Sequence, residues 1–282
     1  MAEPRRIAEA VASKLGVARL SPRRCRDSGV ERRVGLLVAV EGIDGAGTTT
    51  VSRVLVDALS ALGLPAVYTK EPTSSPVGSL IRTILSSRAR IEPELLAHLF
   101  IADRVYHVYE ERVVPEARGV AGAVSAGYIV VADRYKYSNA AYQSKEADPT
   151  SSYTIRDILA LNEVIPPAHI LVYLDVEPTV AYERIRARKY LELYENPGML
   201  AAVRRAYHAL LKLLAETPET PSGAKWAVKI ERHTRLPIRC LYPEETYPSI
   251  ITVDANKALE DVVLETTIRV LRTLLDLSLI HI

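Results

Sequence analysis

Five short runs of mostly apolar residues recur along the chain, each bounded by polar or helix-like sequence. The runs are residues 35–41, 65–70, 128–133, 169–176 and 249–254. Continuous apolar runs of this length are typical of strands buried on both faces, whereas half-exposed strands alternate apolar and polar positions. The pattern therefore predicts the strands of a parallel sheet.

The segments between these runs carry apolar residues at helical spacing. They predict helices over residues 49–62, 76–87, 93–117, 178–188, 197–215 and 257–276. Strands that alternate with helices favour an α/β fold, a doubly wound parallel sheet of about five strands flanked by helices on both faces. We expect one such domain over residues 35–282.

Two segments do not follow this alternation. Residues 1–33 hold nine basic and four acidic side chains, so they carry +5 in a chain whose net charge is +2. Residues 1–34 are therefore predicted to be a basic, solvated extension without the apolar centre of a secretory signal; contact with anions is the alternative. Residues 216–248 contain five prolines and predict an insertion, with a hairpin around residues 225–231.

Composition excludes several classes of protein. Hydrophobic residues make up 48% and charged residues 25% of the chain, and no apolar run approaches the ~18 residues that span a bilayer. Beyond the basic segment the net charge is negative, so we expect neither a nucleic-acid partner nor a membrane. Cys25 and Cys240 are the two cysteines, without a C-x-x-C pair, so we expect no disulfide framework and no zinc site, in a cytoplasmic protein.

The stretch EGIDGAGTTT, residues 41–50, has nearly the form of a phosphate-binding loop, G-x-x-x-x-G-K-[ST]. It follows a predicted strand and opens a predicted helix, where backbone N–H groups and the helix N-terminus attract phosphate. A fold of the P-loop NTPase type is therefore expected, with ATP as ligand. The predicted ATP-binding residues are Gly42, Asp44, Gly45, Ala46, Gly47, Thr48, Thr49 and Thr50.

Thr48 stands where this motif has its lysine. A lysine charge ~4 Å from a phosphate contributes ~4 kcal/mol at an effective dielectric constant of ~20, whereas a threonine hydroxyl returns ~1 kcal/mol. The difference of ~3 kcal/mol corresponds to roughly a hundredfold in rate. The substitution thus predicts an impaired enzyme unless another cation lies nearby.

The sequence VVADRYKYSNAAYQ, residues 130–143, resembles the D-R-Y-x-x-S-x-x-A-Y motif of thymidylate kinases. The stretches TKEPTSSPVGSLIRTIL (69–85), HLFIADRVYHV (98–108) and YENPGMLAAVRRAYHALL (194–211) resemble further segments of that family, in the same order. The resemblance covers about residues 35–215 and the last strand and helix. It implies Mg²⁺-dependent transfer of the ATP γ-phosphate to dTMP, giving dTDP and ADP, by a homodimer.

The resemblance also implies how the acceptor phosphate and the metal are held. Arg134 would clamp the acceptor phosphate, because a guanidinium matches phosphate oxygens bidentately; the alternative is a surface ion pair with Asp133. Thr49 and Asp133 would hold Mg²⁺. Three further residues would complete this part of the site. Asp44 would face the 3′-hydroxyl or the metal region, with a loop cap as the alternative. Glu71 would lie near the sugar and metal, and Arg82 would hold the acceptor phosphate, with a solvated helix face as the alternative.

The base and sugar pockets follow from the same resemblance. Phe100 and Arg104 lie four residues apart, so they share one helical face. Phe100 would stack on thymine, with core packing as the alternative, and Arg104 would donate to the O4 atom and reject the amino group of cytosine. Asn139 would contact the adjacent base edge. Tyr142 and Ser138 would form a wall that excludes a ribose 2′-hydroxyl.

A lid over about residues 184–196 would supply cations to the γ-phosphate. Its predicted catalytic residues are Arg184, Arg186 and Arg188. We expect this lid group to compensate for Thr48, with Arg134 and Lys136 as alternative sources of the charge. Two alternatives stay open: a kinase of another nucleoside or deoxynucleoside monophosphate, and a nucleotide-binding protein without catalysis.

Overall fold

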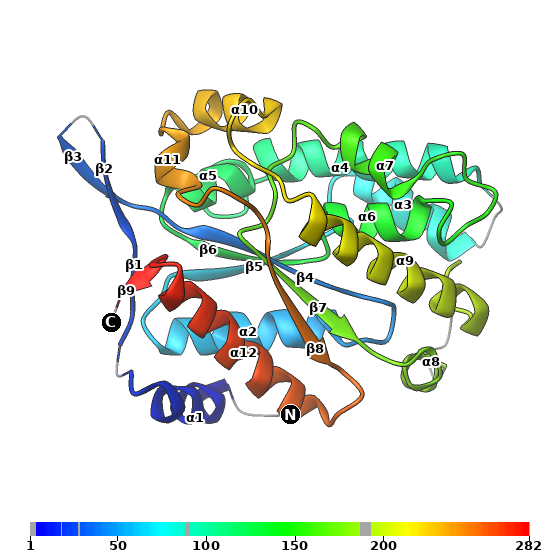
Figure 1. The fold of residues 1–282 in the computed structure, drawn as a ribbon, viewed down its shortest axis with the longest axis horizontal. Coiled ribbons are helices and arrows are strands. Elements are labelled where there is room, and N and C mark those ends of the chain that lie inside the picture. The colour runs from blue at the N-terminus through cyan, green and yellow to red at the C-terminus, as the bar shows by residue number, and fades with distance from the viewer. Residues whose placement is uncertain (1–3, 18, 28, 88–90, 187–192, 282) are drawn as a thin grey trace.

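The apolar runs form one parallel sheet in the computed structural model, which describes residues 4–17, 19–27, 29–87, 91–186 and 193–281 (Figure 1). Its strands lie in the order β5-β6-β4-β7-β8. Their bounds are β4 Leu36–Gly42, β5 Ala66–Lys70, β6 Ile129–Asp133, β7 Ile170–Asp175 and β8 Ser249–Asp254. Because β4 and β6 are buried at every residue, the sheet is covered on both faces, as the apolar runs predict.

Helices cover each face of the sheet (Figure 1). On one face α2 (Thr48–Ala61) and α12 (Leu259–Asp276) pack against the strands and each other. On the other face α5 (Gly119–Ser125) and α6 (Lys136–Gln143) contact β4, and α4 (Pro93–Tyr109) and α9 (Pro197–Glu216) lie outside them. Three shorter helices also lie between the strands in sequence: α3 (Pro76–Ser87), α7 (Ile155–Leu161) and α8 (Pro178–Ile185).

The strand order creates a switch point at β4. The chain passes from β4 to β5 and back to β6 on one side of β4, and then crosses to β7 and β8 on the other side. In open α/β sheets, ligands bind beyond the carboxyl ends of the strands at such a point. The loops after β4, β5 and β6 therefore meet where a ligand is expected.

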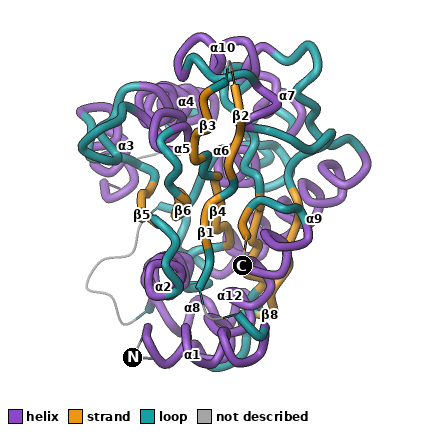
Figure 2. Tube along the Cα trace, turned by 90° about the vertical axis from the view of Figure 1, so that its left-hand side faces the viewer, coloured by secondary structure: helices purple, strands orange, loops and turns teal. Residues whose placement is uncertain are grey.

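The prediction of a solvated N-terminal extension is wrong. Helix α1 (Pro4–Leu15) packs against α2 and α12, an arrangement visible in Figures 1 and 2. Ile7 and Val11 on its inner face are buried, because they lie one turn apart on an apolar stripe. The chain then continues through β1 (Ser21–Pro22), which pairs with β9 (Ile280–His281) near the other terminus.

The predicted hairpin around residues 225–231 is also wrong, because this stretch forms helix α10 (Lys225–Thr234), followed by α11 (Ile238–Leu241). Trp226 and Ile230, four residues apart, are buried, whereas Val228 between them is 48% exposed. The apolar residues therefore follow helical spacing and not the alternation of a strand. Helix α10 packs against α5 and covers that side of the molecule.

A disulfide joins Cys25 to Cys240, although the sequence predicted no disulfide framework. The bond connects β2 (Arg24–Asp27), which pairs with β3 (Val30–Arg33) in an exposed hairpin, to α11. The two residues are 215 positions apart, and only the fold brings their Cα atoms to 5.6 Å. The N-terminal hairpin and the segment before β8 are thus covalently linked.

Candidate active site

The loop after β4 has the backbone shape that a phosphate site requires. Gly45 and Gly47 have φ angles of 89° and 94°, a left-handed conformation that glycine adopts without strain. A Cβ atom on Gly45 would lie 2.3 Å from the carbonyl oxygen of Ala181, so no larger residue fits there. Helix α2 begins at Thr48, which places the positive end of the helix dipole at the loop.

A cavity of about 630 Å³ opens beside this loop at the carboxyl ends of the central strands. Most of the predicted site residues line it, although they come from six separate segments of the chain. They are Asp44, Gly45, Gly47, Thr48, Thr49, Thr50, Glu71, Arg82, Phe100, Arg104, Asp133, Arg134, Ser138, Asn139, Tyr142 and Arg184. Gly42 and Ala46 shape the loop itself, since a Cβ on Gly42 would lie 2.8 Å from that of Ala46.

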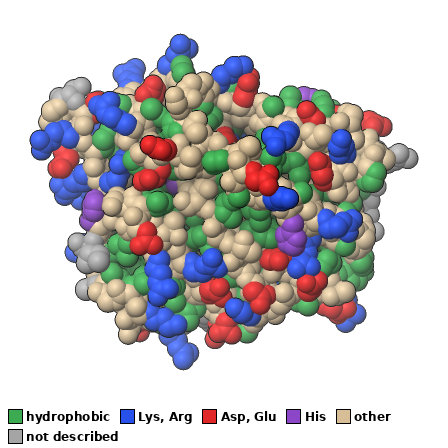
Figure 3. Space-filling model, in the orientation of Figure 1, with side chains coloured by type: hydrophobic (Ala, Val, Ile, Leu, Met, Phe, Trp, Pro, Cys, Tyr) green, Lys and Arg blue, Asp and Glu red, His purple; other side chains and the backbone are tan. Residues whose placement is uncertain are grey.

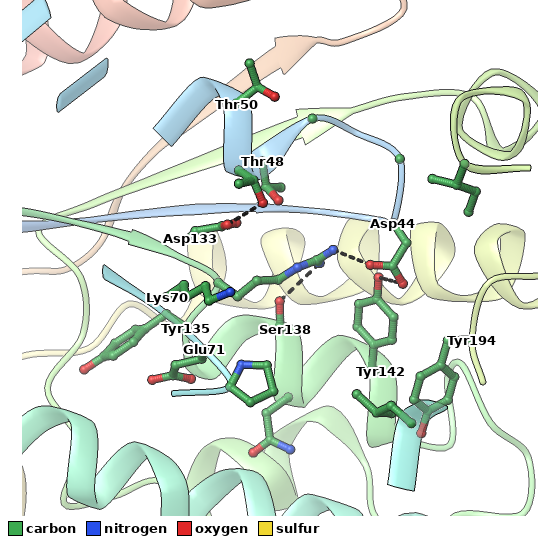
Figure 4. Close-up of a pocket in the computed structure, with 18 of the residues that line it drawn as sticks. Asp44, Thr48, Thr50, Lys70, Glu71, Asp133, Tyr135, Ser138, Tyr142 and Tyr194 are labelled. Carbon is green, nitrogen blue, oxygen red and sulfur yellow. Dashed lines mark hydrogen bonds and ion pairs between the residues drawn. The ribbon is translucent and has the colours of Figure 1, made fainter. Parts of the chain in front are cut away.

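Arg134 is bound to the phosphate loop and not to its neighbour Asp133. Its Nη2 atom lies 2.6 Å from Oδ1 of Asp44, and its Nη1 atom donates to the carbonyl oxygen of Gly42. The hydroxyl of Tyr142 donates to the other oxygen of Asp44 at 3.0 Å (Figure 4). Arg134 also lines the cavity, and its ion pair in the structure is with Asp44 and not with Asp133.

Thr49 and Asp133 lie together on the opposite side of the cavity. The hydroxyl of Thr49 donates to Oδ2 of Asp133 at 2.6 Å, and the hydroxyl of Tyr68 donates to the same oxygen at 3.0 Å. The other oxygen, Oδ1, is buried and has no hydrogen-bond partner among the described residues. Among the residues that the structure describes, no group of three or more His, Cys, Asp or Glu side chains could hold a metal ion.

Arg104 is buried in a polar network beneath the cavity. It donates to Oε2 of Glu71 from Nε at 2.8 Å and from Nη2 at 2.6 Å, and its Nη1 contacts Oδ1 of Asn139 at 3.3 Å. The second oxygen of Glu71 lies 2.9 Å from Nδ1 of His107. Both carboxylate oxygens are thus bonded, and Nη1 of Arg104 also donates to Oδ1 of Asn162 at 3.0 Å. Arg104 and Asn139 are each 1% exposed, and both line the cavity.

The remaining predicted pocket residues have mixed environments. Phe100 is half-buried and lines the cavity, so it contacts the core and the cavity together. Tyr142 is buried and meets Tyr194 edge-to-face at a ring distance of 5.4 Å. Ser138 donates to the carboxylate of Glu41, and Arg82 donates from Nη2 to Ser79 at 2.9 Å.

The lid arginines differ from one another. Nη1 of Arg184 lies 3.4 Å from the carbonyl oxygen of Gly45, and its Nη2 donates to Ala255 at 2.9 Å. Arg186 is 61% exposed and pairs with Glu183. Arg188 lies outside the described residues.

The expectation that Lys136 supplies charge to the phosphates is wrong. Its side chain is 2% exposed and its Nζ atom lies 2.7 Å from Oε1 of Glu219. It is not among the residues that line the cavity. The first residue of α6 therefore points into the protein, which the spacing of the D-R-Y motif alone does not reveal.

Sequence reasoning missed several residues of the site. Glu41 accepts hydrogen bonds from Tyr135 N at 2.8 Å and from the hydroxyl of Tyr207 at 2.9 Å. Burial raises the pKa of Glu41 to about 7. Lys257 lines the cavity, and its only signal in the sequence is its place after the last strand. His107 bonds to Glu71, and its only signal is its position one helical turn beyond Arg104.

Comparison with known proteins agrees with this geometry. The sequence profile of the family described as Thymidylate kinase matches residues 40–218, which is more than half of the chain. The chain belongs to the thymidylate kinase family. This membership confirms the predicted family, the predicted fold class and the predicted enzyme class, a nucleoside monophosphate kinase.

Relatives within the thymidylate kinase family come from distant organisms. A Thymidylate kinase of Xylella fastidiosa is 38% identical over 220 residues, covering 70% of this chain and 95% of the relative. A Probable thymidylate kinase of Pyrobaculum calidifontis is 40% identical over 173 residues, covering 61% of this chain and 80% of its own length. A solved structure of thymidylate kinase from Candida albicans superposes with a TM-score of 0.58 over 85% of this chain and 92% of that one; at 22% identity it shows a shared fold.

Proposed function

We propose that this chain transfers the γ-phosphate of ATP to dTMP, giving ADP and dTDP. The observation that carries the proposal is the composition of one cavity of about 630 Å³. On one side it has a glycine loop at a helix N-terminus, and on the other a guanidinium, an aromatic ring and a polar edge. Phosphoryl transfer requires positioning and charge neutralisation more than covalent chemistry, so no protein nucleophile is needed.

Arg134 is the residue proposed to bind the acceptor phosphate. Its side chain is 17% exposed and its guanidinium is held by Asp44, so the group is fixed in place before a substrate arrives. A guanidinium that is already oriented loses less freedom on binding phosphate than a mobile side chain does. Arg82 lines the same cavity and is the second candidate for that phosphate.

Phe100, Arg104 and Asn139 are proposed to bind the base. Arg104 lines the cavity and is held by Glu71. A hydrogen bond from its guanidinium to the O4 acceptor of thymine, which the N4 amino group of cytosine could not accept, would replace one of its longer bonds, to Asn139 at 3.3 Å or to the carbonyl oxygen of Tyr135 at 3.4 Å. Tyr142 and Ser138 would line the sugar, with Asp44 within reach of its 3′ side. Removal of the ring of Tyr142 would then open space beside the 2′ position.

Thr49 and Asp133 fit a magnesium ion. A hydroxyl beside a carboxylate whose second oxygen is buried without a partner is the type of oxygen donor set that Mg²⁺ shares with nucleotide phosphates. When bound, the ion would neutralise charge on the phosphate oxygens. Asp133 would orient Thr49, and the backbone N–H groups of the loop would bind the phosphates of ATP.

The proposal also names the cation that replaces the lysine charge missing at Thr48. Arg184 lies against the loop at Gly45, and Lys257 lines the same end of the cavity. A cation within ~4 Å of the β- or γ-phosphate would restore most of the ~3 kcal/mol that the lysine would contribute. Arg184 is our first choice because it lies in the last turn of α8, where the predicted lid begins. Arg186 and Arg188 follow it in the sequence and belong to the same proposal.

The acceptor range tests the function against its nearest alternatives. Initial rates of ADP release with dTMP, dUMP, dCMP and UMP, at equal ATP and Mg²⁺, should give the highest kcat/KM for dTMP. A higher value for another monophosphate would assign the site to that nucleotide. ATP binding without acceptor-dependent ADP release would assign the chain to non-catalytic nucleotide binding.

Assembly and location complete the proposal. We expect a homodimer of 31.1 kDa chains without nucleic acid, which light scattering would check. On the face drawn in Figure 3 basic and acidic side chains are interspersed, which supports the expectation that the protein binds no nucleic acid. Among the described residues no helix is long and apolar enough to cross a bilayer. We expect a cytoplasmic enzyme. Because disulfides are rare in reducing compartments, titration of the free thiols in the freshly isolated protein tests that expectation.

A further inference from the structure

Arg134 has an unusual backbone conformation for an arginine. Its φ angle is 75°, in the left-handed region that non-glycine residues rarely adopt. Such a conformation persists only where the surrounding structure fixes it. The residue lies between the end of β6 and the first residue of α6, so the contacts on its two sides decide its position.

On the upstream side the backbone is tied to the strand that carries the phosphate loop. The N–H of Arg134 donates to the carbonyl oxygen of Val40 at 3.0 Å. The N–H of Tyr135 donates to Oε1 of Glu41 at 2.8 Å. These bonds fix the residue relative to β4, and Glu41 also accepts from the N–H of Ser138 at 3.3 Å and from its hydroxyl, which ties one side of the first turn of α6 to the same strand.

The first residue of α6 is held by a separate contact, through the buried side chain of Lys136. Its Nζ atom lies 2.7 Å and 2.9 Å from the two carboxylate oxygens of Glu219, and it donates to the carbonyl oxygen of Ile165 at 3.2 Å. Burial lowers the pKa of Lys136, and the carboxylate of Glu219 acts in the opposite direction. A buried ammonium without its carboxylate would have to move towards water and would pull the first turn of α6 with it.

Glu219 is itself held in place. Its backbone N–H and carbonyl pair with those of Tyr247 at 2.8 Å in each direction, two residues before β8 begins. Its side chain is 26% exposed, so the carboxylate reaches from the surface into the protein towards Lys136. The region that matches the family profile ends at residue 218, so this carboxylate belongs to the part of the chain beyond it.

We propose that the Lys136–Glu219 ion pair positions Arg134 and helix α6 for the acceptor nucleotide. The inference rests on the proposed role of Arg134 in binding the acceptor phosphate. Helix α6 also carries Ser138, Asn139 and Tyr142 to the cavity, whereas the phosphate loop reaches it from β4 and α2. Loss of the pair therefore disturbs the acceptor side and leaves the ATP side intact.

The test compares Glu219→Gln with a matched control in the same segment. Lys225 and Glu163 form an exposed ion pair at 2.8 Å, so Lys225→Gln removes a charge pair of similar length that does not reach α6. Steady-state rates of ADP release are measured against dTMP at saturating ATP, and against ATP at saturating dTMP. Glu219→Gln should raise the dTMP KM at least tenfold while the ATP KM stays within threefold. Lys225→Gln should leave both values within threefold of wild type.

Two results would overturn the inference: a dTMP KM for Glu219→Gln equal to that of wild type, or an equal rise in both KM values, which indicates general loosening. If Glu219→Gln does not fold, Glu219→Asp keeps the charge and withdraws it by one methylene, and should raise the dTMP KM alone by about threefold to tenfold. An unchanged KM in that variant would contradict the inference in the same way. Wild-type protein without dTMP-dependent ADP release would instead refute the proposed function, so the two failures are distinct.

Discussion

Reduction of the Cys25–Cys240 disulfide should lower the free energy of unfolding by several kcal/mol. The bond closes a loop of 215 residues, and the chain-entropy relation gives about 5 kcal/mol for a loop of that length at 25 °C. Measured values are often smaller because the reduced chain retains structure, so we expect a loss of about 2–5 kcal/mol. The hairpin of β2 and β3 is exposed, and the bond to α11 is its main covalent restraint.

The assay is urea or guanidinium unfolding of the wild-type chain with and without a strong reductant. The matched control is the Cys25→Ala/Cys240→Ala variant, whose midpoint should not respond to reductant. Neither cysteine lines the cavity, so the rate of ADP release should stay within about twofold wherever both forms are folded. An unchanged unfolding midpoint, with two thiols titrating as free, would refute this reasoning.

Three further outcomes are expected. Arg184→Ala should lower kcat about 100-fold with the dTMP KM within threefold, because the lost charge acts on the transferred phosphate; an unchanged kcat would move the compensation elsewhere. Arg104→Lys, which keeps a charge beside Glu71, should raise the dTMP KM and relax discrimination against dCMP, and Tyr142→Ala should raise the ribo-to-deoxy rate ratio; wild-type values would reject these assignments. Burial lowers the pKa of His169 to about 4, so its contribution to the free energy of unfolding is present above pH 6.5 and is lost as the pH falls towards 4. The free energy of unfolding, measured at several pH values, should change by up to about 1.4 kcal/mol per pH unit in this range, and the His169→Gln variant should lack this slope.

The central sheet could be predicted from the sequence because its strands are buried on both faces. The predicted run 35–41 is shifted by one residue from β4 (Leu36–Gly42), and the run 128–133 begins one residue before β6 (Ile129–Asp133). Helix ends were less well defined. The predicted helix 93–117 ends at Tyr109, after which an isolated bridge pairs Val114 with Ala117. Apolar spacing continues past the helix end because Val114 in the following loop is buried and Val113 and Ala117 pack partly against the core.

The N-terminal segment and the disulfide could not be predicted in the same way. The arginines of the first 33 residues suggest solvation, but charge on the outer face says nothing about the inner face that carries Ile7 and Val11. Pairing of Cys25 with Cys240 depends on the position of α11, which no local pattern reveals.

Within the site, residue types could be predicted but not their partners. The sequence indicates that Asp44, Arg134 and Tyr142 belong to one pocket, and the structure shows that Asp44 bonds to both of the others. Lys136 is the opposite case, because its charge fits a phosphate site while its orientation is set by Glu219. Short motifs identify the chemistry available, and tertiary contacts decide which group supplies it.

The most direct test of the account is formation of dTDP by the wild-type chain, with Thr48 in its phosphate loop. Purified protein is mixed with ATP, dTMP and Mg²⁺, and the nucleotides are separated over time, with parallel reactions that lack dTMP or contain excess chelator. Transfer of the ATP γ-phosphate to dTMP would produce equal amounts of dTDP and ADP, and neither product should form in the parallel reactions. ADP that accumulates equally without dTMP, or a complete absence of dTDP across temperatures at which the chain is folded, would contradict it.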